Sequence, residues 1–416
     1  MDFKRTELFK KIVRYTPLYK RTIRSINEQN DERKVLYERI NSYIQNVPYY
    51  HNYIKYINKD INIKQFPIIR KPDIQGHELS FVSRKVSKFF IRKEKTGGST
   101  GWSLTIYRSV FDSIISCAYV DYIFSLIGDN LKVAVLRGNK PKNGIFEKVS
   151  SDKIILSSYS LSPDTLDKYL QLLRDYHISC IHAYPSTLSI LSRLIKQRYG
   201  RADLPDLKGI LTSSEIFSKE EKALVTEIFP NVKIIDFYGL NERCCYAYSI
   251  GMKPYHFMNN FGYVEFIETE KLKNGNVIAE IVATSIMNTT MPFIRYGTED
   301  FVELDNKGNI LSIIGRTSDF VVNNFNDLVP CIVITRNESK KNIINFQYFQ
   351  DSIGTLEYRV VVNNDFTEKE KEMLEEDLCN SFDGKMKCIV KVVNEIERTK
   401  IGKQKRLIQK LDLSRR

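Results

Sequence analysis

A short loop rich in glycine and hydroxyl side chains is the first feature of this sequence suited to binding an anion. Residues 95–101 read Lys-Thr-Gly-Gly-Ser-Thr-Gly. Glycine lets the backbone approach a ligand closely, and successive backbone N–H groups can converge on a phosphate while Ser and Thr add donors. The spacing is not that of a Walker loop, and Trp102 stands where a lysine is typical. The loop therefore predicts either a phosphate cradle or an ordinary surface hairpin.

Two acidic turns carry the next chemically useful side chains. Residues 238–243, Tyr-Gly-Leu-Asn-Glu-Arg, follow an apolar strand-like stretch, where open α/β sheets place ligand-binding groups. Glu242 is suited to Mg²⁺, which takes one or two carboxylates plus phosphate oxygens, although a turn with a Glu–Arg pair is the other interpretation. Residues 295–300, Arg-Tyr-Gly-Thr-Glu-Asp, place Asp300 before a β-like segment, where its carboxylate would reach ribose hydroxyls, or form an ordinary charged turn.

A lysine in the basic C-terminal tail completes the set. Lys403 follows Gly402 within 397–406, Glu-Arg-Thr-Lys-Ile-Gly-Lys-Gln-Lys-Arg. On a mobile loop, such a lysine can stabilise negative charge that develops during a reaction. Residues 385–416 contain eleven Lys and Arg and three acids, so +8 of the net charge of +13 lies in this tail. A solvated or nucleic-acid-binding basic run is the alternative.

Alternating helix and strand patterns between about residues 100 and 240 would position these turns. We expect helices over 111–127, 162–176 and 186–198 and after a Ser218–Glu221 capping box, and strands over 132–136, 178–183, 207–212 and 232–237. This order predicts a parallel sheet with helices on its faces. We then expect hairpins at Asn274-Gly275 and Lys307-Gly308, and a small α+β region with strands over 356–362 and 388–393 and a helix capped by Thr367 and Glu370.

The first 60 residues predict amphipathic helices with apolar positions at Leu8, Phe9, Ile12, Val13, Leu36, Ile40, Tyr43 and Ile44. A basic amphipathic helix is also compatible with peripheral membrane contact. No apolar run approaches the ~20 residues of a membrane span, and the N-terminus is charged from its second residue, so we expect a cytoplasmic protein. With 42% hydrophobic residues, the 416-residue chain can bury a large core, which excludes disorder. Seven cysteines without a C-x-x-C favour reduced thiols.

In this order, the motifs resemble the adenylate-forming ligase superfamily, and within it phenylacetate–CoA ligase and its CapK-type capsular-polysaccharide relatives. The sequence supplies TGGSTG, YGLNE, YGTED, GRTSD and ERTKIGKQKR, and the resemblance extends from about residue 90 to 410. Segments 182–186 and 213–215 also look like those of this branch. The resemblance implies a large multi-sheet α/β domain over 1–318, which binds ATP and the acyl substrate, and a small mobile α+β lid domain over 319–416.

The resemblance also implies an activity and its residues. A small carboxylic acid would be activated with ATP and Mg²⁺ to an acyl-adenylate, then transferred to the CoA thiol, or to an amine or hydroxyl in cell-surface polysaccharide synthesis. Lys403, Glu242 and Thr100 would be catalytic, with Glu242 holding Mg²⁺ and Asp319 at the hinge. The acyl pocket would include Tyr184, Phe237 and Cys245. ATP and AMP would contact Thr96, Gly97, Gly98, Ser99, Thr100, Gly101, Ser214, Glu215, Tyr238, Gly239, Asn241, Asp300 and Arg316.

Several residues depart from the family pattern. The departures are Trp102 for a lysine or small residue, Asn241 for Thr, Ser318 for an Asp and Glu397 for a Pro. Some relatives carry a zinc site with a Cys and a His; here His256 is present but Ser249 lies near the expected Cys, so we expect no zinc.

Two other classes of function remain open. A catalytically weakened homologue that acts as a binding or scaffold subunit would explain Trp102 and Ser318. A nucleic-acid-binding protein would explain the charge of +13 and the 24 Tyr and 23 Phe. However, no nucleic-acid module signature appears and the aromatics do not interleave with the basic tail, so we expect no nucleic-acid partner. The acid, the acceptor and the oligomeric state are not indicated by the sequence.

Overall fold

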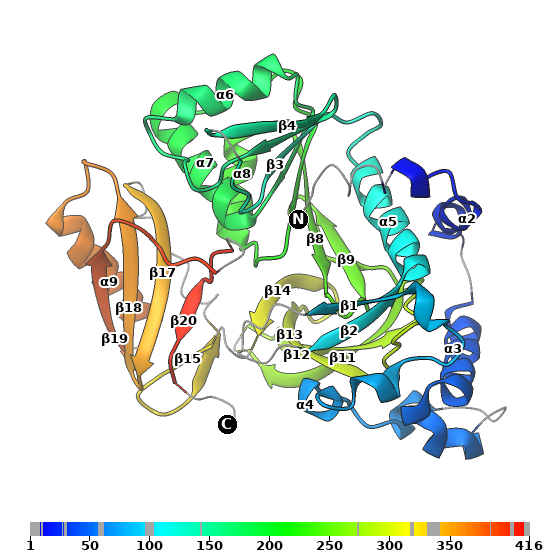
Figure 1. Ribbon diagram of the computed structural model, residues 1–416. Helices are drawn as coiled ribbons and strands as arrows, with labels where there is room; N and C mark the ends of the chain where they lie inside the picture. Colours follow the sequence, from blue (N-terminus) through cyan, green and yellow to red (C-terminus); the bar gives the residue numbers. More distant parts are fainter. Residues whose placement is uncertain are drawn as a thin grey trace. The chain divides into compact units, whose positions relative to one another are not determined.

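The computed structural model (Figure 1) describes residues 9, 11–26, 28, 31–56, 62–95, 104–141, 144–272, 274–316, 320–330, 342–382, 384–399 and 403–411. The chain divides into two compact units. Unit 1 comprises Met1–Asp129, Phe237–Ser249 and Pro254–Leu311, and unit 2 comprises Asn130–Asp236, Ile250–Lys253 and Ser312–Arg416. The predicted domain boundary between residues 318 and 319 lies outside the described residues and stays a prediction.

A mixed sheet with parallel strands forms one half of unit 2. The strands of this sheet that begin in unit 2 are, in order, β8 (Lys233–Gly239, whose end from Phe237 belongs to unit 1), β7 (Gly209–Ser213), β6 (Cys180–Ala183), β3 (Val133–Leu136), β5 (Lys153–Leu156) and β4 (Phe146–Ser150). The pairs β7–β6, β6–β3 and β3–β5 are parallel, and β4 is antiparallel to β5. The connecting helices are α6 (Leu166–Asp175), α7 (Pro185–Tyr199) and α8 (Lys219–Ile228). The predicted α/β fold class is confirmed.

The core of this half explains the layer arrangement. Ile181 and Ile210 from the strands and Leu191 and Ile195 from α7 are at most 1% exposed and belong to one apolar cluster. Strands buried on both faces read as continuous apolar runs, which is the pattern expected of a parallel sheet under helices. The shared cluster therefore fixes the carboxyl ends of these strands relative to one another.

The helix starts follow their capping residues, with one correction. The Ser218–Glu221 capping box of α8 is confirmed, because Ser218 N–H donates to the Glu221 carboxylate (3.1 Å) and Glu221 N–H donates to Ser218 Oγ (3.2 Å). The predicted cap at Ser162 is wrong: α6 begins at Leu166 with Thr165 as its N-cap. Ser162 N–H donates to Thr165 Oγ1 (3.0 Å), so this segment forms a hydrogen-bonded turn instead.

The other half of unit 2 is the predicted small α+β region. Its elements are β17 (Ile343–Ser352), β18 (Thr355–Val362), α9 (Glu368–Ser381), β19 (Lys387–Val392) and β20 (Leu407–Gln409), with sheet order β19-β18-β17-β20. β17 is antiparallel to β18 and parallel to β20. The predicted Thr367–Glu370 capping box of α9 is confirmed. Short strands β15 (Phe320–Val322) and β16 (Leu328–Pro330) pair antiparallel.

Unit 1 combines antiparallel strands with helices. Its main elements are α2 (Pro17–Ile26), α3 (Glu32–Asn46), α4 (Lys71–Ile74), β1 (Ile91–Lys95), β2 (Thr105–Ser109), α5 (Val110–Ser125), β9 (Tyr246–Ile250), β10 (His256–Phe257), β11 (Gly262–Lys271), β12 (Val277–Ser285) and β13 (Tyr296–Leu304), with 3₁₀ turns at Pro48–Tyr56, Ile63–Gln65, Glu78–Phe81 and Lys88–Phe90. Strands β11, β12 and β13 are neighbours in one antiparallel sheet, and β14 (Ile310–Arg316) follows β13. The predicted turns are confirmed, with Gly275 and Gly308 at φ +85° and +79°.

The N-terminal pattern is confirmed for α3 and partly wrong before it. Leu36, Ile40, Tyr43 and Ile44 are all buried on one face of α3. Ile12, in contrast, is 59% exposed, so it does not belong to a core-facing stripe.

Candidate active site

The predicted phosphate loop connects β1 and β2 in unit 1. These strands pair antiparallel, with Lys95 opposite Thr105. The loop itself, including Thr96, Gly97, Gly98, Ser99, Thr100, Gly101 and Trp102, lies outside the described residues, as do Ser318 and Asp319. The roles assigned to these residues therefore stay predictions.

Glu242 lies in a buried turn shortly after β8. Glu242 is 3% exposed, and its Oε1 accepts a hydrogen bond from the Tyr296 hydroxyl at 3.0 Å. The Asn288 side chain donates to the Glu242 backbone carbonyl at 3.0 Å, which fixes the turn. Within the described parts of the chain, no lysine or arginine forms an ion pair with Glu242. The turn thus holds a buried carboxylate that accepts a hydrogen bond from a neutral hydroxyl.

Two arginines lie beside the Glu242 turn without pairing with it. Arg108, on β2, donates to the Asn241 carbonyl at 2.6 Å and also pairs with Glu94 on β1. Arg243 donates to the Asp112 carbonyl at 3.0 Å. Burial, together with the charge of Arg243, lowers the pKa of Arg108. Both guanidinium groups therefore bring positive charge to the same turn, which favours anions such as phosphates.

Asp112 joins the start of α5 to the strand-connecting loop that supports Glu242. Its carboxylate accepts hydrogen bonds from Ser109 N–H (3.0 Å), the Ser109 hydroxyl (2.7 Å) and Thr289 N–H (3.2 Å), and from the Thr290 hydroxyl. The Ser109–Asp112 capping box explains why α5 starts at Val110. Sequence reasoning missed both Arg108 and Asp112. Both are charged residues within an apolar stretch that follows the glycine-rich loop, and this pattern could have indicated them.

Tyr238 and Asp300, which are both predicted to contact the nucleotide, lie together in unit 1. The Tyr238 hydroxyl donates to Asp300 Oδ2 at 2.7 Å. Burial and the Asp300 charge raise the pKa of Tyr238 well above its usual range, so the hydroxyl stays protonated as the donor. The prediction that Asp300 precedes a strand is wrong. Asp300 lies within β13, because the strand already begins at Tyr296. Its N–H donates to Thr298 Oγ1 at 3.1 Å.

In unit 2, side chains gather at the carboxyl ends of β3, β6 and β7. Ser214 follows β7 with a φ of +73°, and its hydroxyl accepts from Arg137, which directly follows β3, at 2.8 Å. The Arg137 guanidinium lies 5.0 Å from the ring centroid of Tyr184, which follows β6. The Arg137 Nε is buried and has no hydrogen-bond partner among the described atoms. Ligands bind at this edge in open α/β sheets, so these groups line a candidate binding surface.

Glu215 connects this edge to the segment that carries Lys403. Its Oε2 accepts from Ser186 N–H at 3.0 Å and its Oε1 accepts from Gln404 N–H at 2.8 Å. Burial raises the pKa of Glu215, while these donors and the Lys403 charge act in the opposite direction. The sequence predicts Ser214 and Glu215 in the large domain and Lys403 in the small one, whereas all three lie in unit 2 of the structure, where Glu215 contacts the residue that follows Lys403.

The remaining predicted residues have mixed placements. A Cβ at Gly239 would come within 2.8 Å of the Tyr246 ring, which explains the glycine. The Phe237 ring packs edge-on against Tyr246, and Cys245 is fully buried. Arg316 ends β14, and its side chain lies outside the described part.

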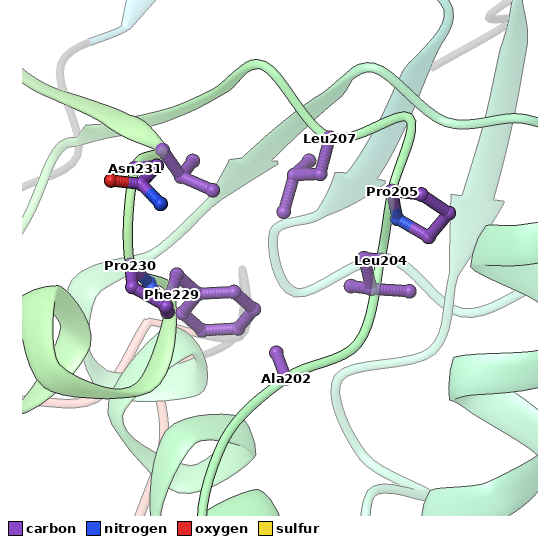
Figure 2. Close-up of a pocket in the computed structure, with 8 residues that line it drawn as sticks. Ala202, Leu204, Pro205, Leu207, Phe229, Pro230 and Asn231 are labelled. Carbon is purple, nitrogen blue, oxygen red and sulfur yellow. The ribbon is translucent and has the colours of Figure 1, made fainter.

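A hollow of about 310 Å³ in unit 2 lies away from this surface (Figure 2). Its walls come from the segments that precede β7 and β8, namely Ala202, Leu204, Pro205, Leu207, Phe229, Pro230, Asn231 and Val232. It thus lies at the amino ends of these strands, opposite to the ligand-binding edge. A hollow of about 470 Å³ in unit 1 has Tyr122, Tyr248 and Phe257 among its walls. Neither is lined by the predicted acyl-pocket residues Tyr184, Phe237 and Cys245.

The described residues contain neither a metal-binding cluster nor a membrane-spanning helix. No group of three or more His, Cys, Asp and Glu side chains is arranged to hold a metal ion. No helix in the same part of the chain is both long and apolar enough to cross a membrane. A magnesium ion held by one carboxylate and by phosphate oxygens does not need such a group.

Comparisons with known proteins agree with the motifs. The family model of the CapK C-terminal domain matches residues 329–410. Protein CapK of Staphylococcus aureus is 26% identical over 388 residues, which cover 85% of this chain and 83% of that protein. Among solved structures, the fold is similar to that of 2-hydroxyisobutyryl-CoA ligase in the postadenylation state, in complex with R3-HIB-AMP. The TM-score is 0.66 at 12% sequence identity, and the match covers 92% of this chain and 90% of the ligase chain. An anthranilate CoA ligase in complex with anthranoyl-AMP has a TM-score of 0.50 at 13% identity, covering 76% and 66%.

The fold is therefore that of the adenylate-forming ligases. Within that class, the expected resemblance to the CapK branch is confirmed by the C-terminal domain and by the S. aureus relative.

Proposed function

We propose that this chain activates a carboxylic acid with ATP and forms an acyl-adenylate and pyrophosphate. The observation that carries the proposal is the Glu242 carboxylate, which is buried and has no cationic partner among the described residues. A buried charge without a partner is costly, so such a site favours a bound cation. Mg²⁺ that arrives with ATP fits, because it takes one or two carboxylates together with phosphate oxygens.

Several groups of unit 1 are suited to orient the nucleotide. In unit 1, Asp300 would accept hydrogen bonds from the ribose hydroxyls while Tyr238 holds its carboxylate and stacks on the adenine. The loop Thr96–Gly101, with Thr100, would donate to the β- and γ-phosphates. Arg108 lies on the strand that follows this loop and would supply part of the positive charge that Trp102 does not.

The adenylation step needs charge stabilisation at the α-phosphate. One oxygen of the substrate carboxylate attacks the α-phosphorus, the bond to the oxygen that bridges to the β-phosphate breaks, and pyrophosphate leaves with that electron pair. Negative charge grows on the α-phosphate oxygens, and the Lys403 ammonium would stabilise it. The bound Mg²⁺ would neutralise phosphate charge.

The transfer step would give the acyl group to a nucleophile, and AMP would leave. The CoA thiol is favoured by the fold, since both solved relatives named above are CoA ligases. An amine or hydroxyl acceptor in cell-surface polysaccharide synthesis is favoured by the resemblance to CapK. In either case the enzyme would work in the cytoplasm, with the 319–416 region as a lid that moves at Asp319.

ATP–pyrophosphate exchange with a panel of carboxylic acids tests the proposal. We expect acid-dependent exchange, and a loss of about 10²–10³-fold in Lys403→Ala, as for other preorganised electrostatic groups. Lys405→Ala is the matched control, because it removes an exposed charge from the same segment and should change the rate less than about twofold. If no acid supports exchange, the second candidate function, a binding or scaffold subunit, is favoured. Trp102 and Ser318 are the sequence features that support this second candidate.

A further inference from the structure

The segment that carries Lys403 is anchored within unit 2 by two carboxylates. Gln404 N–H donates to Glu215 Oε1 at 2.8 Å, and the Arg406 guanidinium pairs with the Glu221 carboxylate at 2.7 Å. The Glu221 and Arg406 side chains are 9% and 10% exposed, so this ion pair is well shielded from solvent. Both acids lie after β7, and the segment is therefore fixed to the edge where ligands bind in this class of sheet.

The base of the lysine loop is also closed on itself. Thr399 N–H donates to the Lys403 carbonyl at 2.8 Å, and Lys403 N–H donates to Thr399 Oγ1 at 3.1 Å. The Gln404 side chain donates to the carbonyl of Phe346 on β17 at 2.6 Å. Lys403 thus lies at the end of a loop that is closed by hydrogen bonds. The next residue, Gln404, donates its amide N–H to Glu215. A shift at Glu215 would therefore be transmitted to Lys403 through one peptide unit.

Glu215 is suited to this role because both of its oxygens are used. Oε2 accepts from Ser186 N–H in the first turn of α7, where the helix dipole favours a negative charge. Oε1 accepts from Gln404 N–H. Hydrogen bonds to a charged acceptor are roughly twice as strong as neutral ones. One carboxylate therefore joins the amino end of α7 to the lysine loop, across 189 residues of sequence.

We propose that Glu215 is a positioning residue for Lys403, holding the lysine loop in the geometry that adenylation requires. The proposal rests on the proposed function, and it assigns Glu215 a role that differs from contact with adenine. An adenine contact would act on ATP binding, whereas a positioning contact acts on the rate at which bound reactants react. The two roles are therefore separable by kinetics.

Hydrogen exchange of the full-length protein tests the contact itself, independently of activity. In Glu215→Ala the Gln404 amide loses its acceptor, and we expect peptides that contain it to exchange about 10–100-fold faster at this position. Glu220→Ala, which removes an exposed acid from α8, is the control and should leave that exchange unchanged. Unchanged exchange at Gln404 in Glu215→Ala would overturn the proposal.

Kinetics then test the role. In ATP–pyrophosphate exchange we expect Glu215→Ala to lower kcat about tenfold, with the KM for ATP changed less than about twofold. A raised KM for ATP with an unchanged kcat would overturn positioning in favour of an adenine contact. Wild-type protein without exchange for any acid would instead refute the proposed function, and the Gln404 amide would still report whether Glu215 holds the loop.

A second pair of variants covers the case in which Glu215→Ala does not fold. Gln404→Pro removes the N–H donor and keeps Glu215, whereas Gln404→Ala keeps the N–H and removes the side-chain bond to Phe346. We expect Gln404→Pro to lower kcat about tenfold more than Gln404→Ala does. Equal kcat values in the two variants would contradict a role for the hydrogen bond to Glu215.

Discussion

Two carboxylates that each follow a strand of the α/β fold have opposite surroundings. Glu242, after β8, is 3% exposed, and among the described residues its carboxylate accepts a hydrogen bond from the neutral Tyr296 hydroxyl. Glu215, after β7, receives backbone N–H groups on both oxygens. Among the described residues the first carboxylate has no cationic partner, whereas the second accepts two backbone N–H groups. Position after a strand places an acid at the ligand edge, but its hydrogen-bond donors decide what it does there.

The largest effect is expected at Glu242. Glu242→Gln keeps the shape and removes the charge, and we expect acid-dependent ATP–pyrophosphate exchange to fall about 10²–10³-fold. The half-saturating Mg²⁺ concentration should rise as well, because the amide is a weaker ligand. Glu268→Gln, an exposed acid on β11, is the control. An exchange rate of Glu242→Gln within about twofold of wild type would contradict this prediction. The Glu242 charge would then make no electrostatic contribution of the usual size to the reaction.

Asp112 extends the comparison to a third acid, one that is satisfied for structural reasons. Asp112→Asn should lower the free energy of unfolding by about 2–3 kcal/mol, because one carboxylate oxygen that accepts hydrogen bonds becomes a donor. Chemical denaturation followed by circular dichroism measures this change, with Asp129→Asn, an exposed position, as control. Equal stability of the two variants would show that the Asp112 contacts contribute little.

A double-mutant cycle sharpens the comparison at Glu215. If Glu215 acts through Lys403, Glu215→Ala should slow exchange about tenfold in the wild-type background and have almost no further effect in Lys403→Ala. High enzyme concentrations keep the residual exchange of Lys403→Ala measurable. The same factor in both backgrounds would mean that Glu215 acts independently of the lysine.

The smallest effect is expected at the Tyr238–Asp300 pair. Tyr238→Phe removes one hydrogen bond, so the KM for ATP should rise about fivefold while kcat stays close to wild type. Tyr263→Phe, on β11, is the matched control. A fall in kcat at constant KM would instead place Tyr238 in the chemical step.

Local patterns in the sequence predicted much of the fold. The alternating helices and strands, the Ser218–Glu221 and Thr367–Glu370 capping boxes and the Asn274-Gly275 turn are all read from neighbouring residues, and all are present. The start of α6 was missed because Thr165 Oγ1 donates to the Ser160 carbonyl and closes a turn there. That competition between a cap and a turn is not visible in residue types alone.

The site was predictable only as a set of motifs. The contacts that give Glu242 and Glu215 different surroundings join residues far apart in sequence, namely Glu242 with Tyr296 and Glu215 with Gln404. Spacing along the chain contains no information on such pairs in a single sequence. Arg108 and Arg137 were missed for the same reason, since each becomes meaningful only beside the turn that it contacts.

Transfer of a carboxyl oxygen to AMP tests the central claim most directly. The acid that supports the fastest exchange is labelled with heavy oxygen in its carboxyl group and incubated with the wild-type enzyme, ATP, Mg²⁺ and hydroxylamine as a trapping nucleophile. Attack of the carboxylate on the α-phosphorus predicts AMP that contains one labelled oxygen, together with pyrophosphate and the hydroxamate. Unlabelled AMP, or ADP and phosphate as the products, would contradict acyl-adenylate formation by this chain.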